Sequence, residues 1–184
     1  MSARPNCNPF PMRPRPRSRA FTLVELIIVI GILAVLSGLL APKVLAHLSK
    51  SHDVRRIADI RAIQKALASY YTDHGSYPAG KKSTIFRQWD VSFDGGFIPE
   101  LVNEGYLSEV PVDPGNDFLC HYRYAVFPAG TGGCKGTTPF YVLGVTKFES
   151  PGFGEEHKGF FKCSGRDWGR EFAYVVGDGA TFLE

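Results

Sequence analysis

The sequence predicts an α+β fold in which a long N-terminal helix, part transmembrane and part amphipathic, packs against a small antiparallel β-sheet head. Three features support this prediction. An apolar run near the N-terminus carries a single charge, the stretch after it repeats apolar residues at helical spacing, and the second half consists of short β-rich runs between glycines and prolines. With 184 residues, 44% of them hydrophobic, the chain can form one modest globular domain plus appendages.

The apolar run begins at Phe21 and reads FTLVELIIVIGILAVLSGLL, with Glu25 as its only charged residue. About 20 helical residues cross a hydrocarbon core of about 30 Å, so this run is a transmembrane helix candidate. Residues 1–20 contain five arginines and no acid. Because positive flanks stay on the cytoplasmic side, we expect the N-terminus in the cytoplasm and everything after Lys43 outside it.

The helical pattern continues beyond the apolar run. Apolar residues recur there mostly every three or four positions, with charged residues between them. Glycine at 75 and proline at 78 are stop signals, so we expect one helix from about Thr22 to Asp73. Its apolar positions after the membrane run are Val44, Leu45, Leu48, Ile57, Ile60, Ile63, Leu67 and Tyr70.

The second half predicts a short helix and three strands. Residues 99–106 start with proline and reach a glycine, as short helices do, while residues 121–127, 140–148 and 171–176 are rich in aromatic and β-branched residues. A small sheet needs a partner for its apolar face, and so does the stripe of the long helix. We therefore expect this stripe to be covered by strand residues near Tyr124, Val142 and Val175.

Charge is distributed unevenly along the chain. Its 21 basic residues include the five leader arginines, which leaves 16 basic residues against all 18 acids after position 20. The body of the chain is thus slightly acidic, and no nucleic-acid partner is predicted. We expect three parts: a basic leader at residues 1–20 that is removed, a hydrophobic transmembrane and assembly helix at 21–52, and a head at 53–184.

The segment RAFTLVEL, from Arg19 to Leu26, combines a basic leader, a small residue, Phe-Thr, two aliphatic residues and Glu before the apolar run. It resembles the prepilin N-terminal cleavage and methylation motif of type IV pilins and type II secretion pseudopilins. The resemblance implies cleavage between Ala20 and Phe21, N-methylation of Phe21, and a role of Glu25 in assembly. The family normally has glycine where Ala20 stands.

Three further segments are similar to pieces of this family. They are residues 53–78, which end in Gly-Ser-Tyr-Pro, GYLSEVPVDP at residues 105–114, and YVLGVTKFES at residues 141–150. The resemblance implies a structural subunit of a type IV pilus-like filament, which is not an enzyme and is polymerised through its N-terminal helix. Its partners would be a prepilin peptidase, the membrane, further copies of the chain, and an assembly platform with its motor ATPase.

Two alternative functions stay open. One is a pseudopilin of a type II secretion or DNA-uptake system, and the other, from a different class, is a signal-anchored binding protein that does not polymerise. In the filament interpretations, the chain is a single-pass precursor in the inner membrane that later enters a periplasmic or extracellular filament. A calcium requirement would favour the secretion alternative.

Glu25 is the residue that most needs a functional explanation. A carboxylate inside an apolar helix costs several kcal/mol unless it is paired. Cleavage frees the amine of Phe21, and in this family the amine of one subunit meets the glutamate of its neighbour. The alternative is that Glu25 lies close enough to the membrane surface to remain solvated.

The cysteines and histidines indicate no catalytic centre. Cys7 lies in the leader, and we expect a disulfide between Cys120 and Cys134 in an oxidising compartment; Cys134 with Cys163, or no bridge, are the alternatives. The five histidines are scattered, and neither a CxxC nor a phosphate loop is present. Asp167 and the turn at Asp178 are similar to the calcium loop of major pseudopilins but suit ordinary turns, so we predict no metal and no cofactor.

Overall fold

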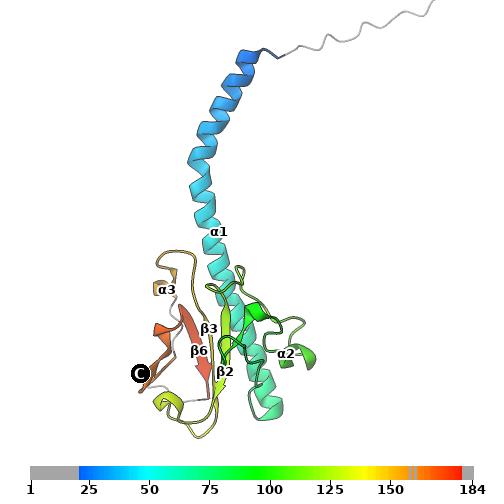
Figure 1. Cartoon of the computed structure of the whole chain (residues 1–184), viewed down its shortest axis with the longest axis vertical. Helices are drawn as coiled ribbons and strands as arrows, with labels where there is room; N and C mark the ends of the chain where they lie inside the picture. The colour runs from blue at the N-terminus through cyan, green and yellow to red at the C-terminus, as the bar shows by residue number, and fades with distance from the viewer. Residues whose placement is uncertain (1–20, 158, 160, 180–184) are drawn as a thin grey trace, which may run out of the picture. The chain divides into compact units, whose positions relative to one another are not determined.

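The structure is a computed structural model that describes residues 21–157, 159 and 161–179, apart from the side chains of residues 39, 41 and 42. The chain divides into two compact units, Met1–Pro42 and Lys43–Glu184. Helix α1 (Leu23–His74) starts in the first and ends in the second, within one residue of the expected helix ends (Figure 1). It stops at Gly75, whose left-handed backbone (φ 69°) lets its N–H reach the carbonyl of Tyr71 at 2.8 Å.

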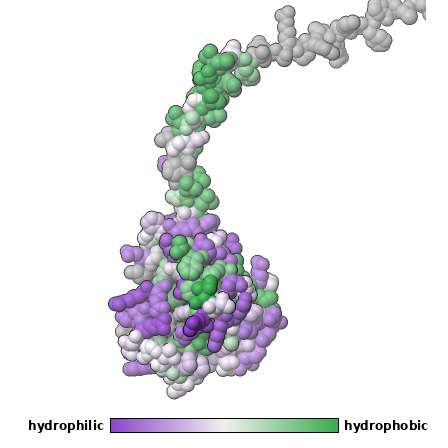
Figure 2. Space-filling view, in the orientation of Figure 1, coloured by the Kyte–Doolittle hydropathy of each residue, from purple (hydrophilic) through white to green (hydrophobic). Residues whose placement is uncertain are grey.

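The described part of the first unit is an exposed apolar helix. Its large side chains from Leu23 to Leu40 are between half and three-quarters exposed where their exposure is described, and Figure 2 shows this surface as largely hydrophobic. Among the described residues, α1 is the one helix whose length and composition suffice to cross a membrane.

The second unit contains a four-stranded antiparallel sheet in the order β1-β2-β3-β6. The three expected strands are present, and each is paired along most of its length. An edge strand of two residues, β1, and a small separate hairpin, β4–β5, were not predicted because such short strands leave no periodic pattern. The strands are β1 (Asp90–Val91), β2 (Tyr122–Phe127), β3 (Phe140–Val145), β4 (Lys162–Cys163), β5 (Arg166–Asp167) and β6 (Tyr174–Asp178).

Short helices connect the strands. The helix expected at residues 99–106 is α2, which is confined to its first turn. The short helices are η1 (Ser92–Asp94), α2 (Glu100–Asn103), η2 (Thr131–Gly133), α3 (Phe153–Glu156) and η3 (Trp168–Arg170), where η denotes a 3₁₀ helix.

The sheet has a separate hydrophobic core on each face. On one face, the fully buried Ile60, Ile63 and Leu67 of α1 pack with strand residues that include Tyr124 and Leu143. These α1 residues are spaced by three and four, as the stripe predicted. Helix-on-sheet packing is therefore confirmed, and Figure 1 shows the second half of α1 beside the sheet.

The second core corrects part of the expected packing. Strand residues alternate between faces, so Val142 and Val175 point away from α1 and pack around the buried Trp168, while Tyr124 does face α1. Phe161 and Phe172 also line this second core. The segment after β3 thus folds back over the far face of the sheet, which explains why every residue of β3 is buried.

Candidate functional site

Two of the predicted processing residues lie at the edge of the described region. Ala20 is outside the described residues, whereas Phe21 precedes the first turn of α1 with 86% of its surface exposed. Helix α1 thus begins close to the position at which the processing motif places the start of the mature chain. Phe21 extends the contiguous exposed apolar surface of α1, and a surface of this kind marks a membrane or protein contact.

Thr22 and Glu25 form a capping box at the start of α1. The backbone N–H and the hydroxyl of Thr22 both donate to Oε2 of Glu25, each at 2.9 Å, and the N–H of Glu25 donates to the hydroxyl oxygen of Thr22 at 3.2 Å. This reciprocal arrangement satisfies N–H groups that a helix start leaves without partners. The glutamate therefore has a partner within its own subunit, and its carboxylate is turned back toward the N-terminal end.

The capping box was missed in the sequence although its signal is present. Thr-Leu-Val-Glu at residues 22–25 has the Ser/Thr-x-x-Glu spacing directly before an apolar run. Interpreting Glu25 through intersubunit pairing alone overlooked this local role. The helix dipole also favours a carboxylate at this end of the helix.

The exposed side of α1 has a recess suited to another helix. Ile28, Gly31, Ile32, Val35 and Leu36 line a shallow apolar hollow of about 360 Å³. No atom lies within 4 Å of the position that a Cβ on Gly31 would occupy. A glycine at such a position allows close helix approach in an apolar environment.

A buried ion cluster surrounds Arg56 in the second unit. Its guanidinium donates to Asp53 and Glu149 at 2.7 Å and to both carboxylate oxygens of Asp113 at 2.7 and 2.8 Å. Burial opposes the charge of Arg56, but its hydrogen bonds to the three carboxylates and the charge of Asp113 raise its pKa above the ordinary value. Asp53 also accepts the backbone N–H groups of Glu149 and Ser150. The cluster therefore fastens two loops to α1.

Asp90 forms a second buried polar centre, near the edge strand. Its Oδ2 accepts the backbone N–H of Lys81 at 2.6 Å and that of Ile98 at 2.9 Å, while Oδ1 is buried without a hydrogen-bond partner. Burial raises the pKa of Asp90 to about 6, and the nearby Asp94 and Glu100 act in the same direction.

His121 is buried in a neutral form. Its Nε2 accepts a hydrogen bond from Arg123 at 2.8 Å, and its Nδ1 lies 3.0 Å from the carbonyl of Asp117. Burial and the charge of Arg123 lower the pKa of His121 to about 4. Phe86 and Phe93 flank its ring at centroid distances of 5.6 and 4.9 Å. This histidine supports packing, as expected from the scattered histidines.

The disulfide expectation was wrong. The bridge joins Cys134 to Cys163, with their Cα atoms 4.6 Å apart. Cys120 is free and half-buried, and burial raises the pKa of its thiol. Cys120 precedes β2 and Cys134 follows it, and six extended residues span roughly 20 Å. Such a separation is far beyond the Cα distance of about 6 Å that a disulfide tolerates.

The two aspartates considered for calcium have partners of their own. Asp167 accepts the N–H of Gly169 at 3.1 Å, and Asp178 accepts the N–H of Gly179 and the hydroxyl of Tyr77. Within the part of the chain that the structure describes, no three or more His, Cys, Asp or Glu side chains are arranged so that they could hold a metal ion. These contacts match the turn interpretation of both residues.

Comparison with known proteins identifies the group to which this architecture belongs. Residues 15–41 match the prokaryotic N-terminal methylation motif, and residues 43–139 match the family model of type II secretion system protein G. No solved structure matches the chain.

Curated relatives agree with the family models. The type II secretion system core protein G of Escherichia coli strain K12 is 32% identical over 136 residues, covering 68% of this chain and 90% of that protein. Its counterpart in Pseudomonas aeruginosa is 32% identical over 136 residues, with 71% and 86% covered, and that of Vibrio cholerae serotype O1 is 29% identical over 139 residues, with 73% and 85% covered. The chain therefore belongs to the type II secretion system protein G family and is a pilin-like pseudopilin.

Proposed function

We propose that this chain is the pseudopilin subunit of a type II secretion apparatus, which polymerises through α1 into a periplasmic filament. The observation that carries the proposal is the protein G match over residues 43–139 directly after an exposed apolar helix with a methylation motif. A type IV pilus-like subunit is a broader description of the chain. The alternative of a secretion pseudopilin fits the relatives better, because they are type II secretion proteins. The role that we propose is structural and non-catalytic, and it is supported by the relatives, which are named as core proteins of a secretion system.

Maturation requires a prepilin peptidase that cuts between Ala20 and Phe21 and methylates the new N-terminus. The motif match over residues 15–41 supports this step. Intact-mass measurement of the membrane fraction should give a chain that starts at Phe21 with one added methyl group. A mature chain that retains the leader arginines, or begins beyond Leu40, would contradict the proposal.

The precursor is anchored in the inner membrane with its leader in the cytoplasm and its head in the periplasm. The five leader arginines support this orientation. The disulfide between Cys134 and Cys163 supports it as well, because such bridges persist in oxidising compartments. An assembly platform and its motor ATPase would lift the subunit out of the membrane, since the exposed apolar part of α1, from Leu23 to Leu40, requires contact with lipid or with other helices.

Assembly uses the carboxylate of Glu25 as the partner of a neighbouring Phe21 amine. In the free subunit this carboxylate is held by Thr22, so the membrane-inserted form does not carry it unpaired. Glu25→Gln keeps the side-chain shape but removes the charge. The variant should accumulate in the membrane at the normal level and form few filaments, whereas a non-polymerising anchored binding protein would be indifferent to the change.

Secretion itself is the functional test. Deleting the gene should abolish release of the organism's secreted enzymes, and the parent chain should restore it while Glu25→Gln should not. Normal secretion in the deletion strain, combined with loss of surface fibres or of DNA uptake, would move the chain to one of the other filament systems.

A further inference from the structure

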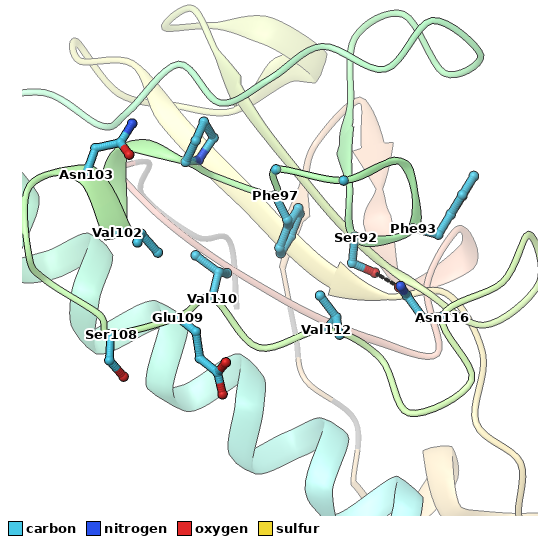
Figure 3. A pocket seen from close by; sticks show the side chains of 13 residues that line it. Ser92, Phe93, Phe97, Val102, Asn103, Ser108, Glu109, Val110, Val112 and Asn116 are labelled. Atoms are coloured by element: carbon cyan, nitrogen blue, oxygen red, sulfur yellow. Dashed lines mark hydrogen bonds between the residues drawn. The ribbon is translucent and has the colours of Figure 1, made fainter.

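An apolar groove of about 510 Å³ lies beside α2 (Figure 3). Val102 enters it from α2, and Val110 and Val112 enter it from the extended stretch that follows. Val102 and Val112 are each about two-fifths exposed, at 38% and 40%. Glu109 also lines the groove, so the surface combines apolar area with a carboxylate.

The groove belongs to an acidic part of the sequence. Residues 88–122 contain seven aspartates and glutamates and no lysine or arginine. Some of these acids have partners: Asp113 pairs with Arg56, and Oε2 of Glu104 lies 2.9 Å from Nε2 of His74. Glu109 is exposed, and in the described part of the chain it makes neither an ion pair nor a hydrogen bond. Its charge is available to a partner.

A complementary surface lies on α1. Six exposed residues of α1, spaced alternately by four and three positions, form one continuous stripe of small, apolar and basic side chains. Neither Arg61 nor Lys65 has an ion-pair partner among the residues described, whereas Arg55, outside the stripe, pairs with Asp59. The stripe consists of Val54, Ala58, Arg61, Lys65, Ala68 and Thr72.

The groove and the stripe lie on different sides of α1. On the groove side, Tyr70 contacts Tyr106 just after α2, with ring centroids 5.4 Å apart. Arg61 instead lines a small hollow with Phe153 and His157 of the α3 region. Arg61 and Tyr70 are nine residues apart, which at about 100° per residue places them on opposite sides of the helix.

We propose that the groove beside α2 of one subunit docks onto the Val54–Thr72 stripe of α1 of a neighbouring copy of this chain. This inference rests on the proposed function, in which copies polymerise. Two different surfaces on opposite sides of one chain associate head to tail, as a filament requires. Val102 and Val112 then cover Val54 and Ala58, and the carboxylate of Glu109 approaches Lys65 or Arg61.

Disulfide crosslinking in filaments of the full chain tests the contact directly. Glu109→Cys and Lys65→Cys are combined in a Cys120→Ser background, since the processed chain lacks Cys7 and its remaining cysteines are bridged. Mild oxidation should produce a ladder of covalent oligomers. The matched control replaces Lys65→Cys by Lys162→Cys, an exposed lysine of β4, and should give monomers.

Charge exchange gives a second readout. Glu109→Lys and Lys65→Glu alone should each lower filament yield at least roughly tenfold, and the two together should restore most of it, because each contact then regains opposite charges. Lys162→Glu should have no effect. Filaments that form normally but give no ladder, or the same ladder in the control, overturn the docking alone. A parent chain that forms no filaments overturns the proposed function, and the docking with it.

Discussion

Glu25 has one observed role and one proposed role. Its carboxylate accepts two hydrogen bonds from Thr22 and so completes the first turn of α1. The same carboxylate is the proposed partner of the Phe21 amine of a neighbouring subunit. Before assembly, its hydrogen bonds to Thr22 lower the free-energy cost of placing this carboxylate in a membrane. A four-residue motif thus gives this helix a stable start and, under the proposed function, also a chemical group for assembly.

The cysteines should differ sharply in their effect on stability. Cys163→Ser opens a bridge with a sequence separation of 29, worth about 3.5 kcal/mol in the chain-entropy estimate, and should lower the melting temperature of the head by many degrees. Cys120→Ser should change it little, because Cys120 is free. Thermal melts under non-reducing conditions decide this, and equal effects of the two variants would contradict the Cys134–Cys163 pairing.

Asp90 and His121 should give opposite contributions to the pH dependence of stability. The pKa of Asp90 is raised from 3.8 to about 6, so the folded state binds its proton more tightly and acidification from pH 7 to pH 4 stabilises the head. The pKa of His121 is lowered from 6.5 to about 4, so the unfolded state binds the proton more tightly and the same acidification destabilises it. In the parent chain the two effects, each on the order of 2 kcal/mol, should largely cancel.

Single variants separate the two contributions. Asp90→Asn should lose stability on acidification because the His121 effect is no longer offset, and His121→Gln should gain stability over the same range. Denaturant unfolding at a series of pH values measures both. Identical pH profiles for the two variants would show that these groups do not control the response.

At the scale of elements, the Arg56 cluster joins α1 to the rest of the head. Asp113 lies in the loop between α2 and β2, and Glu149 lies in the loop just after β3. Both reach Arg56 on α1, which is fully buried. One side chain therefore determines where two loops meet the helix, in addition to the apolar packing of the stripe.

Removing the guanidinium should destabilise the head strongly. Arg56→Met keeps a long apolar side chain but leaves the buried Asp53 and Asp113 without their cation, a loss of roughly 3–5 kcal/mol. The control is Arg55→Met, whose side chain is 62% exposed and should cost less than about 1 kcal/mol. Chemical denaturation of both variants measures the difference, and similar losses would show that burial of the cluster contributes little.

At the scale of the whole molecule, folding and polymerisation should be separable. A chain that starts at Lys43 retains the second unit with both of its cores, so it should fold as a soluble monomer and form no filaments. In this chain Ile63→Asp places a charge in a fully buried site and should cost several kcal/mol, enough to unfold a small domain.

Ala62→Asp is the matched control, because Ala62 neighbours Ile63 on α1 but is exposed. Circular dichroism melts should show a folded Ala62→Asp head and an unfolded Ile63→Asp head. An Ile63→Asp head that melts like its parent would contradict the packing of α1 on the sheet.

The features that depend on local order could be predicted from the amino-acid sequence. The apolar run, the processing motif, the helical stripe through Ile60 and Ile63, and the three longer strands are all periodic or contiguous patterns. The capping box belongs with them, because its four residues are consecutive. Each could be predicted, since neighbouring residues along the chain are also neighbours in space.

The contacts between residues far apart in the sequence became known from the folded structure. Strand β2 keeps Cys120 and Cys134 apart, so Cys134 pairs with Cys163 instead. The way the segment after β3 folds over the sheet places Val142 in the second core. Distant loops also supply carboxylates that surround Arg56. Such contacts join residues far apart in the sequence and leave no periodic signal. They follow from the closure of loops over both faces of the sheet, which local patterns do not encode.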